Sequence, residues 1–224
     1  SIAMMEQLNL SALVARPAVV DPVEVMGIRF PNRVGLAAGL DKDAAYVDGL
    51  AALGFGFLEV GTVTPLPQAG NDKPRMFRLE AENAIINRMG FNNEGVEAFV
   101  RRVRRCRFDG VLGINIGKNK LTPNEDTLQD YLACMKKVYR YASYITINIS
   151  SPNTKDLRAL QFGDELANLL EGIKKSHQEL AEKFDKHVPL VVKIAPDMEE
   201  HELREVCAEL VRQEIDGVIV SNTT

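Results

Sequence analysis

Short apolar runs alternate with longer amphipathic stretches along most of this chain. The apolar runs show no period-two alternation of polar and apolar residues, which is typical of strands buried on both faces. Between them, apolar residues recur at helical spacing; Val96, Phe99 and Val103, for example, share one face of a predicted helix over 92–108. Strands are predicted at 34–38, 57–61, 111–116, 145–149, 190–194 and 217–221.

Turn and capping residues delimit the other elements. Met26-Gly27 predicts a small hairpin within 23–30. Asp41 or Asp43 is expected to cap a helix that runs to residue 53, where Gly54 follows. Further helices are predicted to open at Thr122-Pro123 and to span 163–184 and 199–213.

Strands that alternate with helices favour parallel βα units, and hence an α/β protein. No GxGxxG follows the first strand, so a (β/α)8 TIM barrel fits better than a sheet with one nucleotide crevice. Six strands cannot close an eight-stranded barrel, and the sequence stops directly after an apolar strand. We therefore expect an incomplete copy of a longer barrel, with two more strand–helix units beyond residue 224.

Residues 1–20 differ in pattern from the rest. Ile2, Met5 and Leu8 recur at helical spacing and Pro17 ends the segment, which predicts a short amphipathic helix. Such a helix can pack on its own domain or face a membrane or a partner. We divide the chain into a partial N-terminal helical extension, 1–20, and a barrel domain, 21–224.

Composition narrows the function classes. The net charge of −4 gives no reason to expect nucleic acid as the main partner, and the arginines between 101 and 107 fit a solvated helix face. The 3 cysteines and 3 histidines are scattered, so we expect no metal site or disulfide framework and a reducing compartment. The sequence has no apolar run long enough to span a membrane and no signal peptide.

Small, polar and cationic residues follow every predicted strand, and in a barrel these loops meet at one mouth. Lys193 interrupts an apolar strand; a buried lysine needs an anionic partner, and the alternative is an exposed strand edge. Ser150 and Ser151 follow the strand that ends at Asn148, and alternation allows only one of them to face the mouth. The alternative for that stretch is an ordinary Ser/Pro/Asn turn. The segment between Gly61 and Asn92 is long for a βα loop, as lids and binding loops are.

Eight motifs resemble one family in order and spacing. They are AAGLDK (37–42), EVGTVTP (59–65), NDKPRMFRL (71–79), NRMGFNN (87–93), GINIGKNK (113–120), NISSPNT (148–154), KIAP (193–196) and SNTT (221–224). Together they resemble the quinone-dependent, serine-base class of dihydroorotate dehydrogenase. The resemblance implies an FMN-containing (β/α)8 barrel that oxidises dihydroorotate to orotate in pyrimidine biosynthesis.

Carried over by position, the resemblance implies three groups of site residues. The catalytic group is Ser151 as base, with Thr154 and Phe91 beside its proton exit. The flavin group is Ala38, Gly39, Leu40, Asp41, Lys42, Thr62, Asn115, Asn148, Lys193 and Ser221. The substrate group is Lys42, Asn87, Arg88, Met89, Gly90, Phe91, Asn148, Asn153, Asn222 and Thr223.

The base position also bears on the oxidant, because the soluble classes of this family carry cysteine there. Ser151 thus implies a membrane quinone, with residues 1–20 as part of the extension that lines the quinone entry. Peripheral association with the cytoplasmic face of the cell membrane follows. Two departures stand out: Ser221 replaces a common threonine and keeps its hydroxyl, and the later flavin-phosphate loops and the first part of the extension are missing.

The residue inventory suits this chemistry. Dihydroorotate must lose a proton from one ring carbon and a hydride from the next, so a base is needed opposite the flavin. Asparagine amides pair donors with acceptors, as a pyrimidine ring requires, and a serine base needs a proton relay through Thr154 or water. Two alternatives stay open: a soluble fumarate- or NAD-linked enzyme, and a catalytically silent barrel fragment that only binds ligands.

Overall fold

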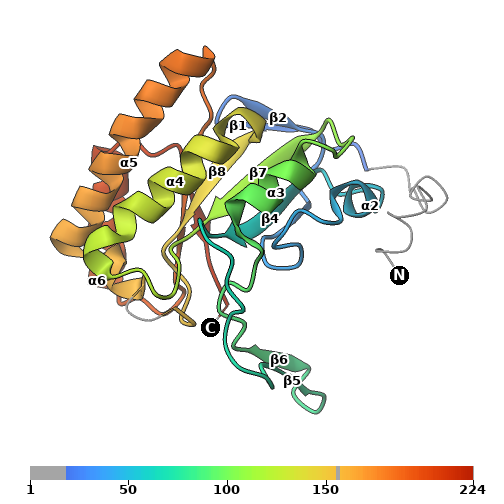
Figure 1. The fold of residues 1–224 in the computed structure, drawn as a ribbon, viewed down its shortest axis with the longest axis horizontal. Helices are drawn as coiled ribbons and strands as arrows, with labels where there is room; N and C mark the ends of the chain where they lie inside the picture. The colour runs from blue at the N-terminus through green and yellow to red at the C-terminus, as the bar shows by residue number, and fades with distance from the viewer. Residues whose placement is uncertain (1–18, 155–156, 224) are drawn as a thin grey trace.

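A curled six-stranded parallel sheet forms the centre of the molecule in this computed structural model, which describes residues 19–154 and 157–223 (Figure 1). Its strand order is β10-β9-β8-β7-β4-β3, and every neighbouring pair is parallel. The strands are β3 (Gly35–Leu36), β4 (Phe57–Val63), β7 (Val111–Ile116), β8 (Tyr144–Asn148), β9 (Leu190–Ile194) and β10 (Gly217–Val220). The predicted parallel βα architecture is confirmed, with the strands in chain order around a partial barrel.

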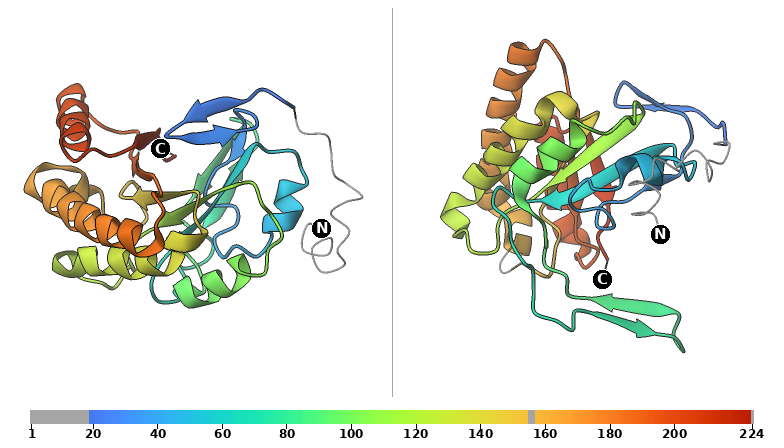
Figure 2. Two further views of the ribbon diagram at one scale, coloured as in Figure 1. Left: turned by 90° about the horizontal axis from the view of Figure 1, so that it is seen from above. Right: turned by 45° about the vertical axis from the view of Figure 1, so that its right-hand side comes forward.

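Helices cover the convex face of the sheet, as the view from above shows (Figure 2). They are α2 (Val47–Ala51), α3 (Gly95–Val103), α4 (Thr127–Val138), α5 (Gly163–Phe184) and α6 (Glu200–Arg212). Strands β7, β8 and β9 are buried along their whole length because helices lie on one face and the barrel interior on the other. Within the described ranges, no helix is long and apolar enough to cross a membrane.

A hairpin lies against the amino ends of the strands. It comprises β1 (Val23–Val25) and β2 (Ile28–Phe30), joined as predicted by Met26-Gly27, whose φ angles of 55° and 71° match a tight hairpin turn. Phe30 packs there with Val111, Tyr144 and Val191 in a small core of its own. The amino end of the sheet is thereby covered, which leaves the carboxyl end for a site.

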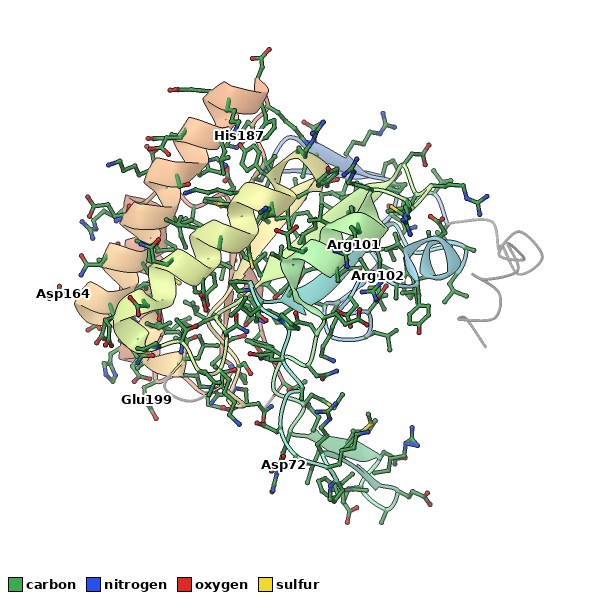
Figure 3. All side chains as sticks on the ribbon, in the orientation of Figure 1. Asp72, Arg101, Arg102, Asp164, His187 and Glu199 are labelled. Atoms are coloured by element: carbon green, nitrogen blue, oxygen red, sulfur yellow. The ribbon has the colours of Figure 1, made fainter. Side chains whose placement is uncertain are left out.

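The long segment after β4 forms an arm that projects from the body (Figure 1). Its antiparallel strands are β5 (Met76–Leu79) and β6 (Ala84–Asn87), with Asp72 near its base (Figure 3). Arg75 Nη1 ties the base by donating to the carbonyls of Ala69 (2.6 Å) and Asn71 (2.9 Å). The sequence predicted a binding loop here, but not this hairpin.

Several predicted helix ends were wrong because side chains bind the backbone before regular helix begins. Helix α2 starts at Val47, since both Asp41 oxygens accept backbone N–H groups, from Ala45 (2.9 Å) and Tyr46 (2.8 Å). Pro123 is extended, and a 3-10 turn (Asn124–Asp126) precedes α4.

Helix α3 is shorter than the predicted 92–108 at both ends, whereas the limits of α5 and α6 are close to those predicted. Helix α3 starts at Gly95, whose N–H donates to Asn93 Oδ1 (2.8 Å), and ends at Val103. The span of α5 is as predicted, and α6 loses one residue at each end. The predicted helix in 1–20 falls almost wholly outside the described residues.

Candidate active site

A cavity of about 350 Å³ opens at the carboxyl ends of the strands, between the sheet and the base of the β5–β6 arm. Loops that follow β3, β4, β8 and β10 contribute to it, and β9 contributes Lys193 from within the strand, as parallel barrel topology allows. Its lining comprises Ala38, Gly39, Leu40, Lys42, Thr62, Met76, Ile85, Asn87, Met89, Gly90, Phe91, Asn148, Ser151, Pro152, Asn153, Lys193, Asn222 and Thr223.

Most residues predicted for the site therefore meet at one cavity; Asp41, Arg88, Asn115, Thr154 and Ser221 do not line it. Asp41 holds the turn before α2, and its carbonyl accepts the Gly61 N–H at 2.9 Å. The Ser221 hydroxyl donates to the Asn222 carbonyl at 2.9 Å. Their roles toward a ligand stay predictions.

Thr154 is buried in the loop that carries Ser151. Its Oγ1 has no hydrogen-bond partner among residues 19–154 and 157–223. A buried hydroxyl without a partner is costly, and such atoms often mark the place of a water or a ligand group. This position fits the predicted proton relay, which no contact in the structure tests.

The sequence missed three lining residues, Met76, Ile85 and Pro152. Met76 and Ile85 lie on the two strands of the arm and are 51% and 61% exposed. They extend an apolar wall out from the polar floor of the cavity. No clear signal in the sequence marks these strands, because Met-Phe-Arg-Leu (76–79) opens with two apolar residues and Ala-Ile-Ile-Asn (84–87) with three, so neither run alternates.

Polar side chains beneath the cavity form a closed hydrogen-bond network. Thr62 Oγ1 donates to Asn115 Oδ1 (2.6 Å), and Asn148 Nδ2 donates to both Thr62 Oγ1 (2.9 Å) and Asn115 Oδ1 (3.1 Å). Neighbouring strands β4, β7 and β8 each contribute one of these residues. Asn115 is thus a support under the lining residues Thr62 and Asn148.

The two serines after β8 have different surroundings. Ser151 lines the cavity, and its Oγ accepts the Asn153 N–H at 3.2 Å. Ser150 is fully buried; its hydroxyl donates to Asn148 Oδ1 at 2.7 Å and accepts from Asn222 Nδ2 at 2.9 Å. Only one serine faces the mouth, as alternation predicted, and it is Ser151.

Phe91 occupies a restricted position in the cavity wall. It is buried and has φ = 51°, which is unusual for an aromatic residue. Beside it, a Cβ on Gly117 would lie 2.7 Å from Thr62 Cγ2 and 3.1 Å from Phe91 Cε2. Gly117 therefore lets Thr62 and Phe91 meet behind the cavity.

Two lysines give the cavity positive charge. Lys193 lies within β9 beside Asn148 and is only 8% exposed, which excludes an exposed strand edge. We expected an anionic partner, but the described residues offer its ammonium group no ion pair or hydrogen bond. Lys42 Nζ donates to the Gly39 carbonyl at 2.7 Å. Burial, and then the charge of Arg75, lower the pKa of Lys42.

Other clusters of ionisable residues lie away from the cavity. Arg101 is exposed on α3, and Arg102 pairs with Glu94 and, at 3.9 Å, with Asp43 (Figure 3). Across the described ranges, no three His, Cys, Asp or Glu side chains are grouped so that they could hold a metal ion.

Comparison with known proteins gives one consistent result. The family model for dihydroorotate dehydrogenase matches residues 21–224. A protein of Chromobacterium violaceum named dihydroorotate dehydrogenase (quinone) is 59% identical over 218 residues, covering 97% of this chain and 63% of the relative. Its namesake from Saccharophagus degradans is 58% identical over 223 residues, covering 100% of this chain and 66% of the relative. The chain thus spans about two thirds of the length of these relatives.

Solved structures agree with the sequence relatives. A crystal structure of dihydroorotate dehydrogenase from Eimeria tenella in complex with ferulenol has a TM-score of 0.87 at 38% identity, covering 100% of this chain and 66% of that one. The ligand-free enzyme from the same organism has a TM-score of 0.85 at 39% identity, covering 100% and 68%. Fold, motifs and relatives coincide, and this chain belongs to the dihydroorotate dehydrogenase family.

Proposed function

We propose that the protein oxidises dihydroorotate to orotate, with FMN as bound cofactor and a membrane quinone as electron acceptor. One observation carries this proposal: Ser151 faces a cavity whose other polar side chains are asparagine amides, lysine ammonium groups and two threonine hydroxyls. That combination suits proton removal from a ring that carries amides and a carboxylate. The relatives with the quinone-dependent name support this acceptor over fumarate or NAD.

The residues present fit an FMN ring. Lys193 brings a buried cation with no partner in the described part of the chain, and Thr62 and Asn148 bring a hydroxyl and an amide whose orientations are fixed. Gly39 has φ = 119°, and a Cβ there would meet nothing within 4 Å, so its backbone offers an open surface to a flat ring. Bound FMN would accept the hydride. We assign Lys193 to stabilising negative charge that develops on the bound ring system.

We assign to Ser151 the removal of the ring proton of dihydroorotate. The Asn153 N–H that donates to its Oγ favours the oxygen when it carries negative charge, as a serine base requires. Arg158 Nε donates to the Ser150 carbonyl at 3.2 Å, and its Nη1 pairs with Asp197 at 2.9 Å. These bonds hold the loop that carries Ser150 and Ser151, here called the serine loop, against the loop after β9. We assign the buried Thr154 hydroxyl, three residues after Ser151, to the proton relay.

Asparagines around the cavity suit the pyrimidine ring. Asn87, Asn148, Asn153 and Asn222 approach from the arm and from the ends of two strands, β8 and β10, and each offers a donor and an acceptor. Lys42 supplies the cation for the carboxylate. Asn71 Nδ2 donates to the Asn153 carbonyl at 3.4 Å and so connects the arm to the serine loop.

Anaerobic addition of dihydroorotate to the full-length protein tests this function. The flavin is expected to lose its visible absorption in single-turnover mixing and to regain it with quinone, but not with fumarate or NAD. A protein that purifies without flavin, or retains flavin that dihydroorotate never reduces, would support the silent ligand-binding fragment instead.

Residues 1–20 are proposed to serve the quinone at the cytoplasmic face of the cell membrane. Deleting them from the full-length protein is expected to impair quinone reduction and spare flavin reduction by dihydroorotate. The two half-reactions, measured separately by stopped-flow, decide it. Equal loss of both would mean that the segment only stabilises the fold.

Lys42 predicts a pH dependence of orotate binding. Its ordinary pKa is 10.5, and burial lowers it, so the positive charge is lost as pH rises at a lower pH than for an exposed lysine. Orotate affinity, measured by flavin absorption, should therefore fall with rising pH before an ordinary lysine would titrate. In Lys42→Arg the charge persists, and the fall should be absent or displaced to higher pH. Identical pH curves for both proteins would assign the loss to another group.

A further inference from the structure

Glu59 is a carboxylate enclosed in the interior of the barrel. It lies in the middle of β4 and is only 4% exposed. No cation pairs with it in the described part of the chain. Instead it accepts three hydrogen bonds, from Asn115 Nδ2 (2.8 Å), Tyr144 Oη (3.0 Å) and Thr146 Oγ1 (3.1 Å). Burying a charge is costly even with such partners, and an apolar residue would fill the space at less cost.

The chemistry of a carboxylate gives these bonds a direction. An ionised carboxylate only accepts hydrogen bonds, so Asn115 must turn its NH2 group toward Glu59. The Asn115 carbonyl oxygen then faces the other way, toward Thr62 and Asn148. On the opposite side, burial and then the neighbouring carboxylate raise the pKa of Tyr144, so that its hydroxyl keeps the proton it donates to Glu59.

The same constraint passes from one side chain to the next. The Asn115 oxygen is an acceptor, so Asn148 turns its NH2 group toward it. The Asn148 Oδ1 consequently faces Ser150 and accepts hydrogen bonds from the Ser150 N–H (3.1 Å) and hydroxyl (2.7 Å). With its hydrogen committed, Ser150 Oγ accepts from Asn222 Nδ2 (2.9 Å). This leaves Asn222 Oδ1 to accept the Thr223 N–H (2.7 Å).

We infer that Glu59 is a positioning residue whose acceptor-only carboxylate sets the direction of this network, and thereby which atoms Asn148 and Asn222 offer in the cavity. Both asparagines line the cavity, whereas Glu59 does not. The inference deepens the proposed function and rests on it, because the ligand whose donors and acceptors must match is the pyrimidine.

Two substitutions at Glu59 separate its effect on the direction of the hydrogen bonds from the effects of its charge and its packing. Glu59→Gln can still present an oxygen to Asn115, because the Tyr144 and Thr146 hydroxyls can accept from its NH2 group. Glu59→Met has similar bulk but no hydrogen-bond acceptor, so it no longer fixes the orientation of the Asn115 side-chain amide. In the full-length flavoprotein, Glu59→Met should weaken orotate binding on the order of tenfold or more, and Glu59→Gln should stay within about threefold of the parent.

Thr146→Val is the matched control. It removes a donor to Glu59 on the side away from the cavity, at a position that does not line it. Its unfolding midpoint should fall, while its orotate affinity stays within about twofold of the parent. A merely structural role for Glu59 predicts instead that orotate affinity follows the unfolding midpoint across all three variants.

A second pair covers the case in which Glu59→Met does not fold. Asn115→Asp places two carboxylates face to face and should weaken or abolish orotate binding. Adding Glu59→Gln lets the new amide donate to Asp while Asp still accepts from Thr62 and Asn148, so the double variant should bind orotate at least about tenfold more tightly than Asn115→Asp alone. No recovery in the double variant overturns the inference.

A measurement without substrate keeps this inference distinct from the proposed function. In protein labelled with ¹⁵N-asparagine, the Asn148 side-chain amide signals should move in Glu59→Met and remain near their parent positions in Glu59→Gln and Thr146→Val. Unmoved signals in Glu59→Met overturn the inference. Reduction of the parent flavin by dihydroorotate, measured on the same preparation, decides the proposed function separately.

Discussion

Ser151→Ala is expected to slow flavin reduction by dihydroorotate at least about a hundredfold, because loss of a general base costs about 10²–10⁴ in rate. Flavin content and orotate affinity should change little, since within residues 19–154 and 157–223 the one hydrogen bond of the Ser151 hydroxyl is to the partly buried Asn153 N–H. Stopped-flow reduction at saturating dihydroorotate measures the effect directly. A variant reduced at the parent rate would remove Ser151 from the mechanism.

Two further serine-loop variants sharpen that experiment. Ser151→Cys keeps an ionisable group at the same position and should retain more activity than alanine, most clearly at alkaline pH, where more of the thiol is ionised. Ser150→Ala breaks the link between Asn148 and Asn222, so it should weaken orotate binding more than it slows the step at saturation. If Ser150→Ala slowed the saturated step as much as Ser151→Ala, the loop rather than the base would be responsible.

Lys193→Met is expected to change activity and stability in opposite directions. Removing the cation should slow flavin reduction by about 10²-fold, a cost typical of losing one preorganised electrostatic contact. In flavin-free protein the same change should raise the free energy of unfolding by about 1 kcal/mol or more, since an unpaired buried ammonium is replaced by an apolar chain of similar length. Denaturant titration with and without FMN, beside rapid reduction kinetics, gives both quantities.

A surface lysine provides the reference for Lys193. Lys136 lies exposed on α4, and Lys136→Met should alter neither the reduction rate nor the unfolding free energy by more than about 0.5 kcal/mol. A large loss of flavin-free stability in Lys193→Met would show that the ammonium group has a structural partner. Lys193 would then stabilise the fold and not act on the flavin.

The strands could be predicted because burial on both faces favours short continuous apolar runs, and turn residues and amphipathic stretches separate these runs along the chain. The β5–β6 arm could not, since much of it is exposed and its turn at Asn83, with φ = 49°, uses no glycine. Helix ends depended on side-chain bonds such as those of Asp41 and Asn93, which link residues that the helical pattern does not distinguish.

Within the site, the sequence predicted the residues that line the cavity better than the residues beneath them that hold them in place. Lys193 drew notice because it breaks an apolar strand, and the same reasoning applies to Glu59 in Phe-Leu-Glu-Val (57–60). Its three donors come from two other strands, so its role became visible only when the fold brought them together. The resemblance implied Asn115 as a flavin contact; it does not line the cavity but bonds to Thr62 and Asn148, which do, and its role toward a flavin stays a prediction.

Gly113, beside Tyr144 in the β7–β8 pairing, restricts the order in which this interior can evolve. A Cβ on Gly113 would overlap the Tyr144 ring. Alanine at 113 thus becomes tolerable only after Tyr144 has been replaced by a smaller residue, and that replacement deprives Glu59 of a donor. Each single step is harmful before any double change is neutral, so epistasis makes substitutions at Gly113, Tyr144 and Glu59 depend on one another, although none of the three lines the cavity.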